Sequence, residues 1–194
     1  TFCTASARLL MPNPFTEYLE LARQRDPTVA SELESLVGRY FQGEVEPAAI
    51  AQYLRIKFNR PDITDDQFLL RESDIAPTVT DFMRNLHGHF VKLGILANLG
   101  AQEYTLLTDF NTHNQLFEVI AGPLALGMKT PLLTQEVFAK ALQLIGEPPR
   151  SCVAVTGDLT YQRFAESLGI TTLAFEGLPK LQQTLEQELA SEVQ

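Results

Sequence analysis

The sequence contains no tryptophan, only two cysteines and no apolar run long enough to cross a membrane. Cys3 and Cys152 lie far apart and show neither the density of a disulfide scaffold nor a paired metal-ligand spacing, so we expect two reduced thiols. The longest apolar stretches are strand-sized and interrupted by glycine, well short of the roughly 20 residues of a membrane helix. The first residues also lack the charged start and apolar core of a signal peptide. These absences predict a cytoplasmic protein with no membrane partner.

Basic side chains are scarce as well, because 15 Lys and Arg stand against 24 Asp and Glu and give a formal net charge of −9. Such a surface repels phosphate backbones, which argues against sequence-independent binding to nucleic acid. With 194 residues, of which 45% are apolar, the chain is long enough for one good core, or for a core domain with a small subdomain.

The first part of the chain has the pattern of helices. Apolar residues recur at helical spacing in three stretches, 15–22, 33–41 and 50–58, and prolines at 27, 47, 61 and 77 interrupt them. From residue 90 onward the pattern changes, since short apolar runs at 91–97, 117–121, 152–156 and 171–175 are each followed by a longer amphipathic stretch. This alternation predicts parallel strands with crossover helices.

In an open parallel sheet, ligands bind at the carboxyl ends of the strands, so the residues after each run are candidate site residues. Asn98 and Asp158 are two of these. A carboxylate that follows a glycine at a strand end can face a hard cation such as Mg²⁺. The alternative is that Asp158 caps the helix that follows it. Lys129 lies on a loop before the helix that begins after Thr134, and a lone lysine there is usually solvated.

The order and spacing of these segments resemble the haloacid dehalogenase (HAD) superfamily, in its branch with a helical cap near the N-terminus. The resemblance rests on LGILAN (93–98), FEVI (117–120), KTP (129–131), FAKALQLIGEP (138–148), VAVTGD (153–158) and AESLGI (165–170). It implies an α/β fold, in which a Rossmannoid parallel sheet is flanked by helices and carries an inserted all-helical cap. It also implies a core of residues 1–13 and 87–194 with a cap of residues 14–86.

The resemblance implies a chemistry as well. In this family an aspartate on the first strand attacks the substrate, a second aspartate two residues later is the general acid/base, and Mg²⁺ neutralises the phosphoryl group. Lys129 matches the lysine of the third motif, and Asp158 matches the first metal-binding acid of the fourth. Asn98 matches the asparagine that often follows the Ser/Thr of the second motif, where this chain has Ala97. Asn98 and Lys129 are thus candidate ligand- or phosphate-binding residues, and Asp158 is a candidate metal ligand.

The chain departs from the family at the catalytic positions. Aligning the first motif with the start of the chain puts Thr4 at the nucleophile and Ser6 at the acid/base, and residues 1–11 contain no Asp or Glu. A threonine hydroxyl cannot replace the carboxylate as nucleophile and then as leaving group. The fourth motif has no further acid at residues 159–163. One carboxylate in place of three predicts that Mg²⁺ binding is weak or absent.

These departures favour a HAD-like protein that lacks the aspartate nucleophile and acid/base, is catalytically inactive or impaired, and acts by binding. Its partner would be a small molecule, phosphorylated or not, or another protein, and the chain would be a monomer or a homodimer. The alternative is an active Mg²⁺-dependent HAD phosphatase or hydrolase that acts on a small phosphorylated metabolite. A third possibility is a purely structural protein whose cleft is filled by side chains.

Overall fold

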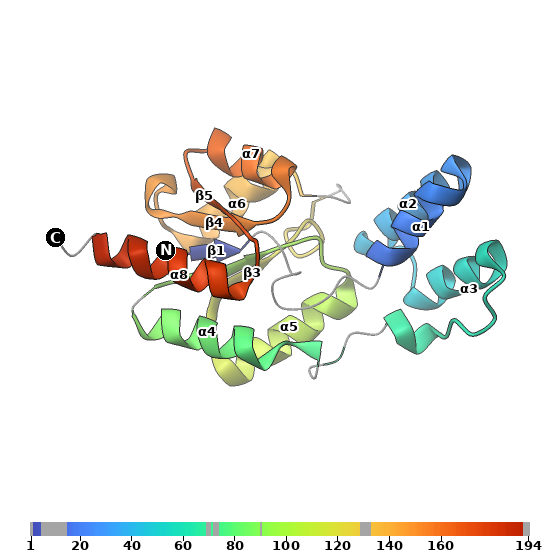
Figure 1. Ribbon diagram of the computed structural model, residues 1–194, viewed down its shortest axis with the longest axis horizontal. Helices are drawn as coiled ribbons and strands as arrows, with labels where there is room; N and C mark the ends of the chain where they lie inside the picture. Colours follow the sequence, from blue (N-terminus) through green and yellow to red (C-terminus); the bar gives the residue numbers. More distant parts are fainter. Residues whose placement is uncertain are drawn as a thin grey trace.

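The computed structural model of the chain describes residues 2–4, 15–68, 71, 74–89, 91–128 and 133–191. Within these residues one parallel sheet has the strand order β3-β2-β1-β4-β5 (Figure 1). Its strands are β1 (Phe2–Thr4), β2 (Leu93–Leu96), β3 (Phe117–Ala121), β4 (Val153–Thr156) and β5 (Thr171–Ala174). The four apolar runs read from the sequence are therefore confirmed as strands, and β1 is the central strand between β2 and β4.

Helices cover both faces of the sheet, as the alternating pattern predicts (Figure 1). On one face lie α4 (Pro77–Gly88), α5 (Ala101–Asn114) and α8 (Leu178–Ser191), and on the other lie α6 (Gln135–Ile145) and α7 (Leu159–Ser167). Neighbouring strand residues point to opposite faces. Ile95 accordingly packs in the cluster with α4 and α5, whereas Leu96 packs in the cluster with α6.

Helix α6 forms where the sequence predicts it. The hydroxyl of Thr134 accepts a hydrogen bond from the Val137 N–H at its start, which satisfies one of the free amide groups of the first turn. Gly146 ends the helix with a positive φ of 73°, a backbone conformation that glycine adopts without strain. Between these residues the apolar stripe that contains Phe138 and Leu142 is buried against the sheet. The helix therefore packs against β2 and β3 on this face of the sheet.

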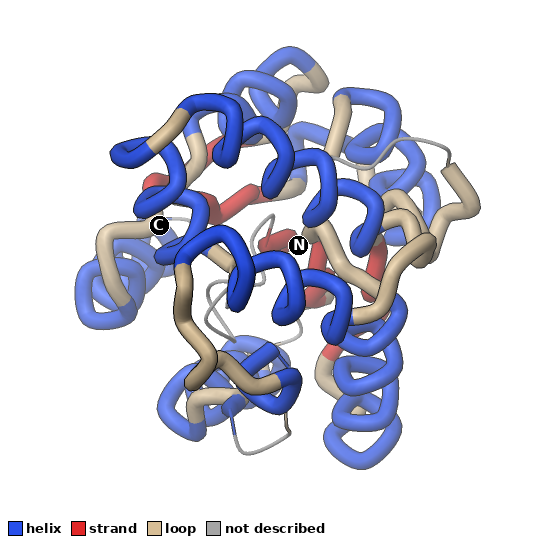
Figure 2. Tube along the Cα trace, turned by 90° about the vertical axis from the view of Figure 1, so that its right-hand side faces the viewer, coloured by secondary structure: helices blue, strands red, loops and turns tan. Residues whose placement is uncertain are grey.

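The helices α1 (Thr16–Arg25), α2 (Pro27–Phe41) and α3 (Pro47–Phe58) lie to one side of the sheet, together with the short 3₁₀ helix η2 (Asp65–Phe68) (Figures 1 and 2). Proline occupies the first position of α2 and of α3, where its fixed φ suits a helix start. The group has an apolar cluster of its own, centred on Phe15, which stacks on Phe68 and meets Tyr40 edge to face. We call this unit, residues 15–68, the cap.

Helix α4 packs on the sheet domain. Its buried side chains, among them Val79, Phe82 and Met83, belong to the cluster on the sheet. The sequence placed the end of the cap at residue 86, because α4 continues the run of helices and no strand interrupts it. That division of the chain stays a prediction.

Candidate functional site

The register of the sheet places three of the predicted site residues at one edge. Thr4 ends the central strand and is level with Ile95 on β2 and Val155 on β4. Asn98 lies three residues beyond Ile95, and Asp158 lies three residues beyond Val155. The carboxyl ends of β1, β2 and β4 therefore bring Thr4, Asn98 and Asp158 to the same edge. Ser6 and Lys129 lie outside the described residues.

Asn98 uses its side-chain amide to hold two other segments. Its Nδ2 donates to the hydroxyl oxygen of Tyr161 at 2.9 Å, and its Oδ1 accepts from the backbone N–H of Leu133 at 2.7 Å. One bond reaches the first turn of α7, and the other reaches Leu133, the residue before the N-cap residue of α6. The amide thus fixes the backbone around the strand ends. The Nδ2 group has two N–H donors, and the bond to Tyr161 uses one of them.

Asp158 is the N-cap of α7. Its Oδ1 accepts hydrogen bonds from the backbone N–H groups of Thr160 at 2.8 Å and Tyr161 at 3.3 Å. Its own N–H donates to Oγ1 of Thr156, a fully buried threonine, at 3.1 Å. The capping role considered from the sequence is therefore present. A metal-binding role for Asp158 stays a prediction.

The described side chains do not fit a carboxylate-built Mg²⁺ site. Within the part of the chain that the structure describes, no three His, Cys, Asp or Glu side chains gather in a group that could hold a metal ion. Mg²⁺ in proteins is held through carboxylates together with substrate phosphate. Among the predicted site residues that the structure describes, the carboxylate is that of Asp158, and it already accepts two amide N–H groups.

The cap meets the sheet domain at the same edge. The hydroxyl of Tyr40, on α2, donates to Oε2 of Glu103, on α5, at 2.5 Å. Both residues are buried, with 3% of Tyr40 and 5% of Glu103 exposed. The cap also comes near Leu124, which follows β3, since a β-carbon built on Gly43 would lie 3.7 Å from its Cδ1. The cap therefore lies over the carboxyl ends of β2 and β3.

The surroundings of this pair shift both titrations. Burial raises the pKa of the Glu103 carboxyl above its ordinary value, although the Tyr40 hydroxyl and the backbone N–H groups of Glu103 and Gly100 act in the opposite direction. Burial also raises the pKa of Tyr40, and the Glu103 carboxylate adds to that rise. Tyr40 therefore keeps its proton and remains a hydrogen-bond donor.

Sequence reasoning missed Glu103. Its partner Tyr40 belongs to the apolar cluster of the cap and also makes the cap's contact with the sheet domain. Glu103 carried one signal: it is the third residue of α5, where a glutamate often reaches back to the amide of the N-cap residue, here Gly100. A glutamate at this helix position is usually exposed to solvent. Here the contact with Tyr40 of the cap buries it.

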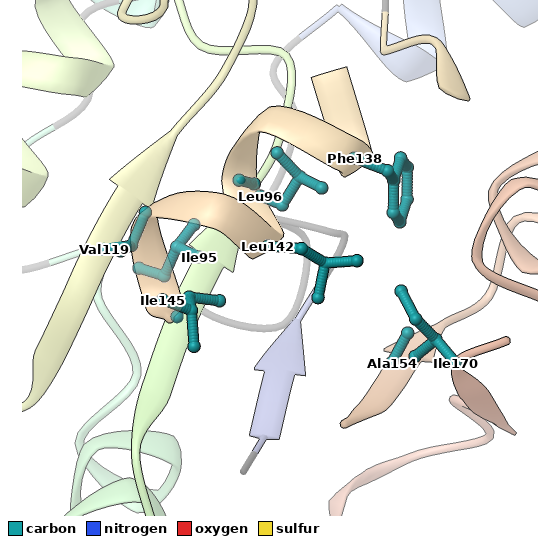
Figure 3. A pocket seen from close by; sticks show the side chains of 10 residues that line it. Ile95, Leu96, Val119, Phe138, Leu142, Ile145, Ala154 and Ile170 are labelled. Carbon is teal, nitrogen blue, oxygen red and sulfur yellow. The ribbon is translucent and has the colours of Figure 1, made fainter. Parts of the chain in front are cut away.

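The strand ends are tightly packed. A β-carbon at Gly122, directly after β3, would lie 2.3 Å from the carbonyl oxygen of Ala97. Tyr161, Phe138 and Phe164 form a cluster of rings between α6 and α7. The apolar cavity between α6 and the sheet, with Phe138 and Leu142 on its wall (Figure 3), has a volume of about 10 Å³. A cavity of that size holds at most a water molecule and is no ligand site.

A larger hollow of about 380 Å³ lies at the C-terminal end of α6 and is lined by Gly146, Glu147 and Pro149 among others. These residues lead into the start of β4, so the hollow is at the amino ends of the strands, away from Asn98 and Asp158.

Among the helices in the described ranges, none is both long and apolar enough to cross a bilayer.

The strand order, the helices on both faces and the helical cap together define a capped α/β protein with the haloacid dehalogenase-like fold, which confirms the fold class expected from the sequence. A HAD family enzyme from Bacteroides thetaiotaomicron, solved in complex with magnesium and inorganic phosphate, matches with a TM-score of 0.61 and 16% identity over 93% of this chain and 98% of that one. A predicted HAD-like family hydrolase from Porphyromonas gingivalis matches with a TM-score of 0.58 and 13% identity, over 95% and 97% of the two chains.

A β-phosphoglucomutase from Clostridium difficile is also similar, with a TM-score of 0.54 and 11% identity over 98% of each chain. No protein-family model matches the sequence, and no curated protein does. At these identities the likeness establishes the fold.

Proposed function

We propose that this chain is a HAD-fold protein without aspartyl-phosphotransfer chemistry, which acts by binding a small phosphorylated ligand at the strand ends. The observation that carries the proposal is the position of Thr4. It ends the central strand β1, level with Ile95 and Val155, where the resemblance places the nucleophilic aspartate. A neutral hydroxyl group there supplies neither the carboxylate that attacks phosphorus nor an acyl phosphate that water hydrolyses readily.

The proposed ligand is chosen from the chemistry that the edge retains. The Bacteroides enzyme of the same fold was solved with magnesium and inorganic phosphate, which supports a phosphate-bearing ligand here. In this proposal Lys129 supplies the positive charge. Asn98 accepts the N–H of Leu133, which lies four residues after Lys129. We assign to Asn98 the role of positioning the chain that follows Lys129. Mg²⁺ has a weak role or none, since Asp158 caps α7 and the described carboxylates do not gather around it.

A cytoplasmic location is part of the same proposal. It rests on the two widely separated cysteines in the sequence, and Cys152 is a buried thiol whose Sγ lies 3.5 Å from the Pro148 carbonyl oxygen. A protein reduced in this way needs no oxidising compartment to fold.

Two assays test the proposal. The first measures Mg²⁺-dependent hydrolysis of p-nitrophenyl phosphate by the wild-type chain and by Asp158→Ala. We expect no turnover above buffer from either. Turnover by the wild type that the Asp158→Ala substitution abolishes would overturn the proposal in favour of a working Mg²⁺-dependent hydrolase.

The second assay measures inorganic phosphate binding by titration calorimetry. We expect Lys129→Ala to weaken binding at least about tenfold, because a hydrogen bond to a charged group is worth that much. Lys140→Ala is the matched control, since Lys140 is an exposed lysine of α6 that faces Glu136. Equal binding by the two variants would contradict the assignment of Lys129. No phosphate binding by the wild type would contradict the ligand class and leave a protein partner.

A further inference from the structure

The cap and the sheet domain have separate apolar cores, and a polar pair joins them. The cluster around Phe15 contains cap residues only, and the two clusters on the sheet contain none from the cap. Each unit is therefore stabilised by an apolar core of its own. The hydrogen bond from Tyr40 to Glu103 is a buried contact that crosses between them.

Gly100 completes this contact. It is the N-cap of α5, and a β-carbon built on it would lie 2.6 Å from Cζ of Tyr40 and 2.7 Å from Oε2 of Glu103. The tyrosine ring can lie against the start of α5 because that position has no side chain. The backbone at Gly100 is extended, with φ −71° and ψ 173°, a conformation open to any residue. The glycine is therefore required for space and not for backbone freedom.

A buried carboxylate costs free energy unless donors replace its water, and here the donors come from both units. The start of α5 supplies the N–H groups of Gly100 and Glu103, and the cap supplies the Tyr40 hydroxyl. Among the described residues, Glu46 at the start of α3 is a further charged group that acts on Tyr40. Lifting the cap would return the Glu103 carboxylate to water and leave Tyr40 on the cap.

We propose that Tyr40 and Glu103 form a latch, a buried hydrogen bond that holds the cap over the carboxyl ends of the strands and opens with pH. By holding the cap down, the latch controls the access of ligands to the edge of the sheet that carries Asn98 and Asp158. It does not depend on whether that edge binds a phosphorylated ligand or performs a reaction.

The direction of the pH effect follows from burial. With the cap down, burial raises the pKa of Glu103, and with the cap lifted the carboxyl regains its ordinary value in water. The closed state therefore binds the proton more tightly. As pH rises through the raised pKa, the closed state loses that advantage and the lifted state gains population.

Single-molecule energy transfer between a dye on the cap and a dye on the sheet domain measures the fraction of lifted caps. Ile56 on α3 and Leu144 on α6 suit the dyes, because they are 70% and 60% exposed. In the unliganded wild type we expect the lifted fraction to rise as pH increases above the ordinary carboxyl pKa. In Tyr40→Phe we expect the ratio of lifted to closed molecules to rise at least about tenfold, the value of a hydrogen bond to a charged group.

Three further variants separate the latch from a general loss of structure. Glu103→Gln keeps a buried hydrogen-bonding group without charge, so its caps should stay closed at every pH. Gly100→Ala keeps both partners but separates them with a methyl group, and it should lift the cap as Tyr40→Phe does. Tyr53→Phe removes a cap hydroxyl that bonds to Val29 and Glu32 within the cap, and it should behave as the wild type.

Two results would overturn the proposal. One is a lifted fraction in Tyr40→Phe and Gly100→Ala equal to that of the wild type, with circular dichroism showing both variants folded. The other is a Glu103→Gln variant that keeps the wild-type dependence on pH. No ligand is added in any of these measurements, so the outcome is independent of the proposed function.

Discussion

Nδ2 of Asn98 donates a hydrogen bond to the Tyr161 hydroxyl at 2.9 Å, and this contact joins the loop after β2 to the first turn of α7. The sequence resemblance assigns Asn98 to ligand binding and expects a further acid in the stretch 159–163 that contains Tyr161. The structure puts a neutral hydrogen-bonded pair there. The pair holds the strand ends in place and supplies no charge for a metal ion.

Replacing Asn98 with alanine should destabilise the sheet domain. The change removes the acceptor of the Leu133 N–H and the donor to the Tyr161 hydroxyl. We therefore expect the free energy of unfolding to fall by about 1–3 kcal/mol. Chemical denaturation measures it. Asn114→Ala is the control, because Asn114 bonds to Phe110 and Arg84 at the far end of α5. A loss no larger than that of the control would show that the Asn98 bonds hold nothing together.

Asp158 should contribute to stability as a helix cap and not through a metal ion. Asp158→Ala removes the acceptor for the Thr160 and Tyr161 N–H groups and should cost about 1 kcal/mol, whereas Asp158→Asn keeps an acceptor and should cost less. Added Mg²⁺ should leave the melting temperature of the wild type unchanged. A Mg²⁺-dependent rise that both variants lose would instead identify Asp158 as a metal ligand.

Gly122 should tolerate no side chain. In Gly122→Ala the new β-carbon would lie 2.3 Å from the Ala97 carbonyl oxygen, a backbone atom that can move only with β2. We expect a loss of about 1–3 kcal/mol, as for other overpacked sites. Gly88→Ala is matched to it, because a β-carbon at Gly88 on α4 meets nothing within 4 Å. Denaturation curves that coincide for the two variants would rule out the close contact.

The two leucines of α6 should differ sharply. Leu142 lines the cavity against the sheet, and Leu142→Ala should enlarge that cavity and cost about 2–5 kcal/mol. Leu144 is exposed, and Leu144→Ala should change stability by no more than about 0.5 kcal/mol. Thermal or chemical unfolding distinguishes them, and similar losses would mean that the buried face of α6 is assigned wrongly.

Local signals in the sequence were enough to predict much of the fold. The apolar runs predicted the strands, and Thr134 predicted the start of α6, because caps and periodicity depend on neighbouring residues. The cap boundary stays a prediction, since α4 has the same helical pattern as α2 and α3. Only its packing on the sheet through Val79 and Phe82 separates it from them.

The candidate site was predicted in part for the same reason. The position of Asn98 and Asp158 at one edge follows from parallel strands, and it could be expected from the sequence. Their partners could not, because Tyr161 lies 63 residues from Asn98, and Glu103 lies 63 residues from Tyr40. Contacts between residues so far apart in the sequence depend on the tertiary fold, and neither tyrosine belongs to a sequence motif that predicts its contact.

The most direct test of the central claim asks whether the chain forms a phosphoryl-enzyme. The protein is incubated with Mg²⁺ and acetyl phosphate, quenched in acid, and weighed intact by mass spectrometry. With Thr4 at the end of the central strand, the account predicts that the mass does not change. A Mg²⁺-dependent gain of one phosphoryl group that Asp158→Ala abolishes would contradict it.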